Sequence, residues 1–329
     1  MERAEQLFSE AQQAAGADER LVARVELARG YVRQVSAPDG VGAFPALAAR
    51  WIPVLERHRD HEGLAHAYKA LARAQFAAGR AGAADEACVR ALEQCALGGA
   101  PPDGYVLYLR GTALLAGPAP IAEAIAYADE RIERADGHAT SPVGLLAECA
   151  AMTGDFARAR ELASAYRASF DEQGRVPPVL EAEVELIAGD PVAAERLARP
   201  VYEFQIESGD IGHGAGSGLV LSRALLEQGR LEDAAALVDE VSALAPTDDL
   251  HAQIEWRAIA GRARGDVRLA REALSLAEGT EWPNVRARAR LDVASVASEP
   301  ERSALVAEAV EIFAAKGNRV EAERAARLS

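Results

Sequence analysis

The chain has 329 residues, which at about 150 residues per globular domain would make two domains. Alanine supplies 74 of them and the aromatic residues only 17, so much of the 50% hydrophobic content adds little volume to a core. The net charge is −15, with Lys69 and Lys316 as the only lysines. An acidic chain lacks the basic surface that nucleic-acid binding requires. The composition disfavours an aromatic-lined catalytic cavity and favours close helix packing.

Nothing in the sequence indicates a membrane segment or a secretion signal. The longest uncharged runs, residues 111–122 and 211–222, are interrupted by Pro or Gly, and residues 1–5 are charged. The three cysteines, Cys88, Cys95 and Cys149, show no metal-ligand spacing. We therefore expect a cytoplasmic protein that binds neither membrane nor cofactor.

One six-residue phrase recurs along the chain and opens on a glycine in each copy. The copies start at Gly79, Gly154, Gly189, Gly229 and Gly265, with a degenerate copy at Gly117. The alanines that close the six copies are Ala84, Ala122, Ala159, Ala194, Ala234 and Ala270. Successive alanines are 38, 37, 35, 40 and 36 residues apart, and Ala304 continues the series after another 34 residues. Such a regular period predicts a stack of helix pairs of about 37 residues.

The phrase has a mechanical interpretation in a pair of antiparallel helices. The glycine ends the first helix in the left-handed conformation, and the Asp that follows it in some copies caps the second helix. The closing alanine then falls where the two helices cross and permits their close approach. Around Gly79, the apolar residues recur at i+3 and i+4, which is the helical period.

Read in chain order, the pattern predicts about eighteen helices and no strands, from a half-pair at 2–15 to a last helix at 319–328. The expected fold is all-α, a right-handed α-solenoid of about eight helix pairs with half-pairs at its ends. We expect one array over residues 1–329, divided into units near residues 18, 60, 102, 139, 176, 213, 249, 283 and 318.

These units resemble tetratricopeptide repeats, whose helices carry large, Leu and small residues followed by Ala, aromatic and Ala. Tyr68, Leu71, Ala72, Ala84 and Ala91 match those positions. Most units are two to six residues longer than the 34-residue standard of the family. The resemblance implies a scaffold that binds protein or peptide.

Two stretches are similar to a narrower group within these repeats. Residues 59–67 resemble a Gly-Asp-x-x-Gly-Leu-Ala-x-Ala phrase in the C-terminal arrays of bacterial adenylate/guanylate cyclases that carry an ATPase module, and residues 309–324 resemble the end of those arrays. Related arrays occur in LuxR-type ATP-binding transcription activators. The chain holds no Gly-x-x-x-x-Gly-Lys-Ser/Thr phosphate loop. We therefore expect it to be the C-terminal part of a larger bacterial signalling protein.

Three local features invite a chemical interpretation and also have a plainer one. The glycine-rich stretch 209–218 suggests a phosphate cradle, but no strand precedes it, and a flexible loop leading into a closely packed helix is favoured. His58, His61 and His66 suggest a metal site, but their spacing is unsuitable, and a solvated loop with a turn at Asp60 is favoured. Cys88 and Cys95 share one helix face and are expected to pack rather than react.

The remaining candidate is the concave groove that first helices line in tetratricopeptide arrays. Transferred through the glycine alignment, its polar positions are His66, Lys69, Arg73, Glu148, Arg223, Glu255 and Arg262. We expect a non-catalytic interaction or signal-sensing scaffold whose groove holds a protein or peptide partner, with an ATPase or cyclase module as one candidate. The alternatives are the regulatory region of a class III nucleotide cyclase and the helical arm of a LuxR-type activator.

Overall fold

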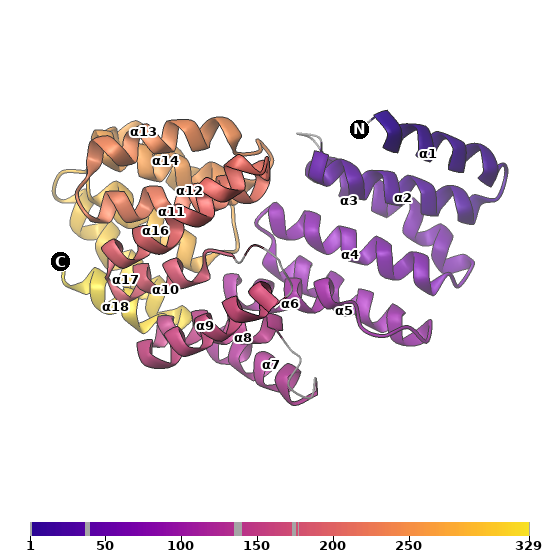
Figure 1. The fold of residues 1–329 in the computed structure, drawn as a ribbon, viewed down its shortest axis with the longest axis horizontal. Helices are drawn as coiled ribbons and strands as arrows, with labels where there is room; N and C mark the ends of the chain where they lie inside the picture. The colour runs from indigo at the N-terminus through magenta and orange to yellow at the C-terminus, as the bar shows by residue number, and fades with distance from the viewer. Residues whose placement is uncertain (1, 37–39, 135–139, 173–175, 177, 329) are drawn as a thin grey trace. The chain divides into compact units, whose positions relative to one another are not determined.

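The computed structural model describes residues 2–36, 40–134, 140–172, 176 and 178–328, and all of their regular structure is helical (Figure 1). Eighteen helices and no strands occur in these ranges, which confirms the predicted fold class. None of these helices is long and apolar enough to cross a membrane. The helices group into two compact units, Met1–Ala113 and Leu114–Ser329. The prediction that residues 1–329 act as a single array stays a prediction.

The first unit is a series of antiparallel helices, of which the first five each pack on their chain neighbours (Figure 1). Its helices are α1 (Glu2–Ala15), α2 (Glu19–Ser36), α3 (Gly40–Arg57), α4 (His61–Ala77), α5 (Ala81–Leu97) and most of α6 (Gly104–Ala116). Phe44 and Leu55 are its largest fully buried side chains, and alanines of α4 and α5 fill much of the rest. The core is therefore built from small residues along the stack.

The second unit begins within α6 and continues the alternation of first and second helices. Its helices are α7 (Ile121–Arg134), α8 (Thr140–Thr153), α9 (Phe156–Glu172), α10 (Leu180–Ala188), α11 (Pro191–Glu207), α12 (Ile211–Glu227), α13 (Leu231–Leu244), α14 (Leu250–Arg264), α15 (Val267–Glu278), α16 (Pro283–Ala294), α17 (Glu301–Lys316) and α18 (Arg319–Ala326). The first helices α8, α10, α12, α14 and α16 each contact the next in the series. The predicted unit division near residue 139 lies outside the described residues.

The glycine turns between paired helices have the predicted geometry. Gly189 caps α10 with φ 85°, where a side chain would be strained, and Asp190 then accepts a hydrogen bond from the Ala193 backbone N–H at 2.9 Å. Gly265 and Asp266 repeat this arrangement between α14 and α15. The recurring phrase is therefore a combined C-cap and N-cap.

Of the six alanines expected at helix crossings, five are fully buried and Ala122 is not. Fully buried alanines occupy the fourth residue of the second helix: Ala84, Ala159, Ala194, Ala234 and Ala270. Ala122 is exposed, because the Pro-containing turn before it delays α7, and the fourth residue is instead the buried Ala124. Ala304 is also exposed, and α17 buries Ala309 in its place.

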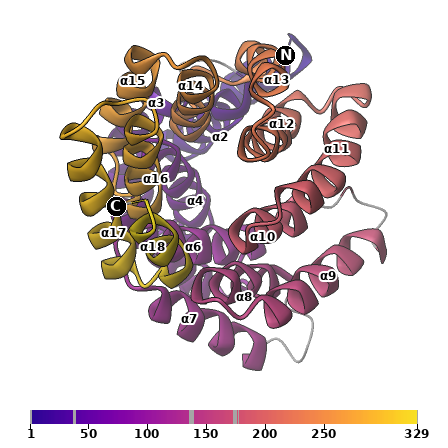
Figure 2. The ribbon, with the colours of Figure 1, turned by 90° about the vertical axis from the view of Figure 1, so that its left-hand side faces the viewer.

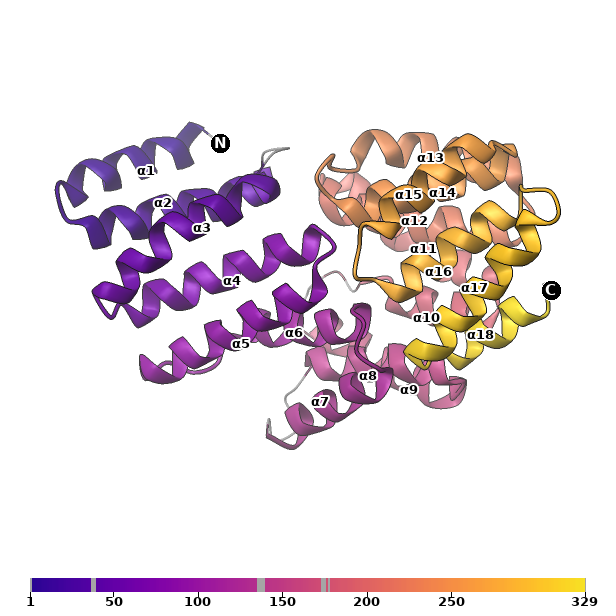
Figure 3. The same cartoon turned by 180° about the vertical axis from the view of Figure 1, so that it is seen from behind.

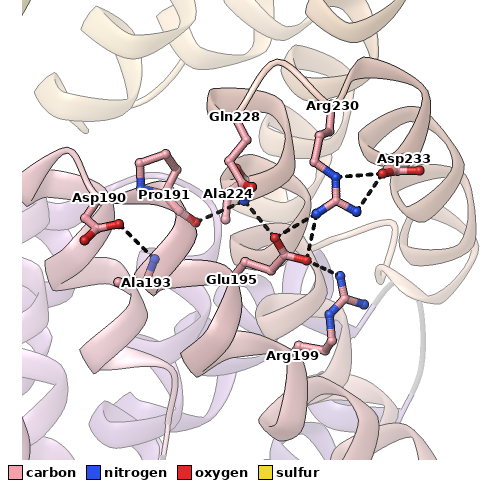
Figure 4. A network of polar contacts seen from close by, with 9 residues as sticks. All are labelled: Asp190, Pro191, Ala193, Glu195, Arg199, Ala224, Gln228, Arg230 and Asp233. Atoms are coloured by element: carbon pink, nitrogen blue, oxygen red, sulfur yellow. Dashed lines mark hydrogen bonds and ion pairs between the residues drawn. The ribbon is translucent and has the colours of Figure 1, made fainter.

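A polar clamp at the turn end of α11, α12 and α13 joins two successive pairs (Figure 4). Glu195 accepts hydrogen bonds from Arg199 at 2.6 Å, Gln228 at 2.8 Å and Arg230 at 2.8 Å. Arg199 is the main cause that lowers the pKa of Glu195 to about 2. Gln228 also donates to the Pro191 carbonyl at 3.2 Å. The register between the two pairs is thus fixed by polar contacts as well as by packing.

The glycine-rich stretch 209–218 is helical from Ile211, so the prediction of a flexible loop there was wrong beyond Asp210. Asp210 caps this helix and accepts from the His213 backbone N–H. The glycines are tolerated because one face packs tightly: a Cβ on Gly218 would lie 2.5 Å from Val241 Cγ2 and 2.9 Å from Tyr202 Cε2. Gly216 faces open space, with nothing within 4 Å of an added Cβ.

These two glycines give a matched pair of substitutions on one helix. Gly218→Ala is expected to lower the free energy of unfolding by about 1–3 kcal/mol, because Val241 and Tyr202 must shift. Gly216→Ala is expected to raise it by about 0.5–1 kcal/mol through helix propensity alone. Urea unfolding followed by circular dichroism measures both. Equal effects of the two substitutions would contradict the packing described for α12.

The second unit closes on itself, because α18 packs against α8 and α10 (Figures 2 and 3). The buried Lys316, at the end of α17, donates from Nζ to the carbonyls of Leu114 at 3.0 Å, Gly117 at 2.7 Å and Ala119. Arg324 on α18 donates to the Ile187 carbonyl at 2.7 Å. The last helices of the chain thereby cap the ends of α6 and α10.

Candidate binding surfaces

In the first unit, the predicted groove residues Lys69 and Arg73 lie among polar and aromatic side chains of neighbouring first helices. Lys69 Nζ on α4 is 2.9 Å from Asp103 Oδ2 and 6.0 Å from the centre of the Tyr31 ring on α2. Arg73 donates from Nη1 to the backbone carbonyl of Gln34 at 3.1 Å and to its Oε1 at 3.2 Å. These contacts hold both cations in place on one face.

Tyr105 on α6 extends this face and is 38% exposed, although burial of its hydroxyl raises its pKa. We call the set Tyr31, Gln34, Lys69, Arg73 and Tyr105 the unit 1 surface. An exposed aromatic ring beside fixed cations is a common composition for a protein-binding face.

The solvated loop predicted for the three neighbouring histidines is confirmed only at His58, which is exposed in the turn before Asp60, whereas His61 and His66 lie on α4. The turn at Asp60 is confirmed, but Asp60 is buried: it caps α4 by accepting from the Gly63 backbone N–H at 3.0 Å and pairs with Arg24. His61 Nδ1 lies 2.8 Å from Gln94 Oε1, and His66 is exposed on α4. Among the described residues, no group of His, Cys, Asp and Glu is arranged to hold a metal ion.

In the second unit, the predicted residues Arg223 and Glu255 meet in a buried ionic network. Arg223 on α12 is 2.9 Å from Glu255 Oε2 on α14 and 2.8 Å from Asp292 Oδ1 on α16. Burial would lower the pKa of Arg223, but the two carboxylates outweigh it and raise the pKa. Burial would raise the pKa of Glu255, but Arg223, with smaller contributions from His251 and Arg288, outweighs it and the pKa falls to about 2. Arg223 and Glu255 are therefore both charged at neutral pH.

Arg262, also predicted, extends the network along α14. Its Nη1 is 2.7 Å from Glu227 Oε1 on α12 and 3.5 Å from Asp292 Oδ1. Burial would raise the pKa of Glu227, but Arg262 and Arg223 together lower it. Arg223, Glu227, Glu255, Arg262 and Asp292, which we call the unit 2 network, link three first helices through side chains.

Glu148 lies apart from this network, on the first helix α8. In the described part of the chain it makes no hydrogen bond and no ion pair, and the charged group that acts on its carboxyl is Glu183 on α10. Burial, with a smaller contribution from Glu183, raises the pKa of Glu148 to about 8. Burial also raises the pKa of Glu183. Helices α8 and α10 therefore carry two buried carboxyl groups, and His251 and Arg288 offset only part of the rise in the pKa of Glu183.

Glu148 predicts a specific pH dependence of stability. The folded chain keeps this carboxyl protonated up to about pH 8, whereas its ordinary pKa is 4.5, so stability falls as the pH rises between these values. Glu148→Gln is expected to raise the free energy of unfolding at pH 8.5 by about 1–3 kcal/mol, and by clearly less at pH 5. Urea unfolding at both pH values measures this, and Glu161→Gln, at an exposed ion pair of α9, is the control. A gain that does not change with pH would contradict the assignment.

The cysteines behave as the sequence predicts. Cys88 and Cys95 on α5 are buried free thiols, and burial raises the pKa of Cys88 to about 12. Cys149 on α8 is also buried, and burial raises its pKa to about 12. Thiols with such high pKa values are poor nucleophiles, so packing is their role here.

The structure adds residues that the groove pattern did not identify. Asp292 completes the unit 2 network, and Gln34 and Tyr105 complete the unit 1 surface. Asp292 lies four residues after Arg288 on α16, so the same helical stripe, continued into that unit, would have found it. The pattern could not identify Gln34, since an uncharged side chain at a helix end gives no distinctive signal.

The fold is similar to that of a known structure. A Rap protein, solved in complex with competence and sporulation factor, matches with a TM-score of 0.63 and 13% identity over 99% of this chain and 90% of that chain. No family model and no curated protein sequence matches the chain. At this identity the likeness shows the fold alone, which is that of a tetratricopeptide-like helical array.

Proposed function

We propose that the chain is a non-catalytic scaffold that binds a protein or peptide on the faces of its first helices, and that residues 1–329 act as one array. The observation that carries the proposal is the placement of the charged groove residues. Six of the seven predicted groove residues contact or face groups of neighbouring repeats. Lys69 and Arg73 belong to the unit 1 surface, and Arg223, Glu255 and Arg262 belong to the unit 2 network. Glu148 interacts with Glu183. His66 is the exception, being exposed without such contacts.

Two further observations support a binding role. The Rap protein, which has a similar fold, was solved in complex with competence and sporulation factor. We propose by analogy that this chain also binds a partner. The cysteines are buried, and the described residues form no metal-binding group, so the side chains of the described surfaces suit recognition better than catalysis. Purified chain is accordingly expected to show no cyclase or ATPase turnover, and robust turnover would overturn the proposal.

The test reverses the charge of the unit 1 surface. Lys69→Glu with Arg73→Glu is expected to abolish capture of partners by the full chain used as bait, with bound proteins identified by mass spectrometry. The matched control is Arg57→Glu with Arg90→Glu, which makes the same charge change at exposed positions of the second helices α3 and α5. Partners that persist in the first variant and vanish in the second would move the binding face to the second helices.

The signalling context is a second candidate, favoured by residues 59–67 and 309–324, which resemble the arrays of cyclase–ATPase proteins. Under this proposal the partner is an ATPase or cyclase module of a bacterial signalling protein, and the chain works in the cytoplasm. The neighbouring genomic sequence tests it: a reading frame with a cyclase or ATPase module supports this context, a helix-turn-helix module favours the transcription-activator alternative, and neither module counts against both.

A further inference from the structure

A cavity of about 230 Å³ lies within the second unit, between α10, α12, α14, α16, α17 and α18. Its lining carries five arginines and three carboxylates: Arg223, Arg262, Arg288, Arg302, Arg324, Glu227, Asp292 and Glu321. In a chain with net charge −15, this lining therefore has an excess of two positive charges. Leu186, Leu291, Val306 and Leu328 supply apolar surface. The volume is below the range of drug-sized sites and suits one amino-acid residue.

The positive excess resides in Arg288 and Arg302, of which Arg288 also acts at longer range on the carboxylates of Glu183, Glu227 and Glu255. Arg223, Arg262 and Arg324 each pair with a carboxylate of the lining, at 2.7 to 2.8 Å. Arg288 on α16 and Arg302 on α17 make no side-chain hydrogen bond and no ion pair in the described part of the chain, although both line the cavity. Two guanidinium groups beside one small cavity form a receptor for an anion.

Two buried polar atoms of the same lining are also unpartnered. Arg223, whose side chain is 7% exposed, leaves its Nε–H without an acceptor, and Asp292, whose side chain is 2% exposed, leaves Oδ2 without a donor. A buried polar atom without a partner destabilises the fold, so a ligand that supplies a partner to both atoms would be bound more tightly. That ligand must offer an acceptor and a donor close together.

We propose that this cavity binds the carboxyl-terminal residue of a polypeptide, with its carboxylate at Arg288 and Arg302, its amide N–H toward Asp292 and its apolar side chain toward Leu291 and Val306. Such a residue carries the anion, the donor and the apolar group that the lining requires. Phosphate lacks the donor and the apolar group, and the three carboxylates would repel its second charge. The assignment rests on the proposed peptide-binding function and names the part of the peptide that is read.

The test compares two pools of fluorescein-labelled hexapeptides with random residues followed by a final Leu, one with a free carboxylate and one with a terminal amide. By fluorescence anisotropy on the full chain, the free-carboxylate pool is expected to bind at least tenfold more tightly. Arg288→Gln is expected to remove this preference; because Arg288 makes no side-chain hydrogen bond or ion pair among the described residues, the variant should fold, and circular dichroism checks this. Arg271→Gln, at an exposed ion pair of α15, is the control.

Three outcomes would overturn the assignment. The first is equal binding of the two pools, which includes no binding of either. The second is an unchanged preference for the free carboxylate in Arg288→Gln. The third is competition by inorganic phosphate that is as strong as competition by N-acetyl-leucine, which would mark a simple anion site. The result is separable from the proposed function, because partner capture through Lys69 and Arg73 is measured independently. Capture that persists without carboxylate preference would remove the cavity assignment alone.

Discussion

Replacing Arg223 with Met is expected to lower the free energy of unfolding by about 3–5 kcal/mol, the largest effect of any single substitution in the second unit. The substitution leaves Asp292, 2% exposed, and Glu255, 12% exposed, without their main cation. Arg262 remains near Asp292 but at 3.5 Å and already paired with Glu227. The loss of stability arises because the substitution leaves a buried carboxylate without a cation.

The measurement is urea unfolding, in which a lower midpoint with an unchanged slope reports a loss of stability. Arg271→Met is the control: Arg271 pairs with Glu301 at 2.8 Å, but both side chains are about half exposed, so a loss below about 1 kcal/mol is expected. Adding Asp292→Leu to Arg223→Met should recover part of the loss, because it removes a stranded charge. A further loss in that double variant would contradict the buried-charge explanation.

Replacing Lys316 with Met is expected to cost about 2–4 kcal/mol and to open the closure of the second unit. Burial lowers the pKa of Lys316 to about 8, so at neutral pH the ammonium is mainly charged and donates all three of its hydrogen bonds. Met retains the apolar stem but leaves the carbonyls of Leu114, Gly117 and Ala119 without this donor. The cost comes from the carbonyls that remain buried.

The only other lysine provides the control for Lys316. Lys69 forms one ion pair with Asp103, and both side chains are partly exposed, so Lys69→Met should cost about 1 kcal/mol or less. Hydrogen exchange should show lost protection at α18 and at the start of α7 in Lys316→Met, with α13 unaffected at first. Equal losses in the two variants, or uniform loss of protection, would show that Lys316 does not hold the closure.

The repeated features of the fold were predictable because they depend on local chemistry. A glycine followed by a capping residue specifies a helix turn wherever it occurs, as at Gly189 and Gly265. The alanine prediction failed at Ala122 because two extra turn residues moved the crossing to Ala124, a shift that a fixed offset from glycine cannot reveal. The start of α12 was predicted too late because glycine has low helix propensity, and tertiary packing against Tyr202 and Val241 overrides it.

The candidate site was predictable only where the helical stripe repeats. Arg223, Glu255 and Arg262 occupy equivalent stripes on successive first helices, and the structure brings them into one network. The closure of the second unit gave no signal in the sequence, because Lys316 contacts residues about 200 positions away and occurs once. Contacts without a period must be seen in three dimensions.

That closure also sets an order of events during synthesis. The Lys316 ammonium is made 202 residues after the Leu114 carbonyl that it caps, which at about 5–20 residues per second is a delay of at least ~10 s. In the first unit, the Arg73 guanidinium reaches Gln34 after only 39 residues. The first unit can therefore assemble before Lys316 is made, whereas the surface of α8 and α10 that α18 covers stays exposed until α18 has been synthesised.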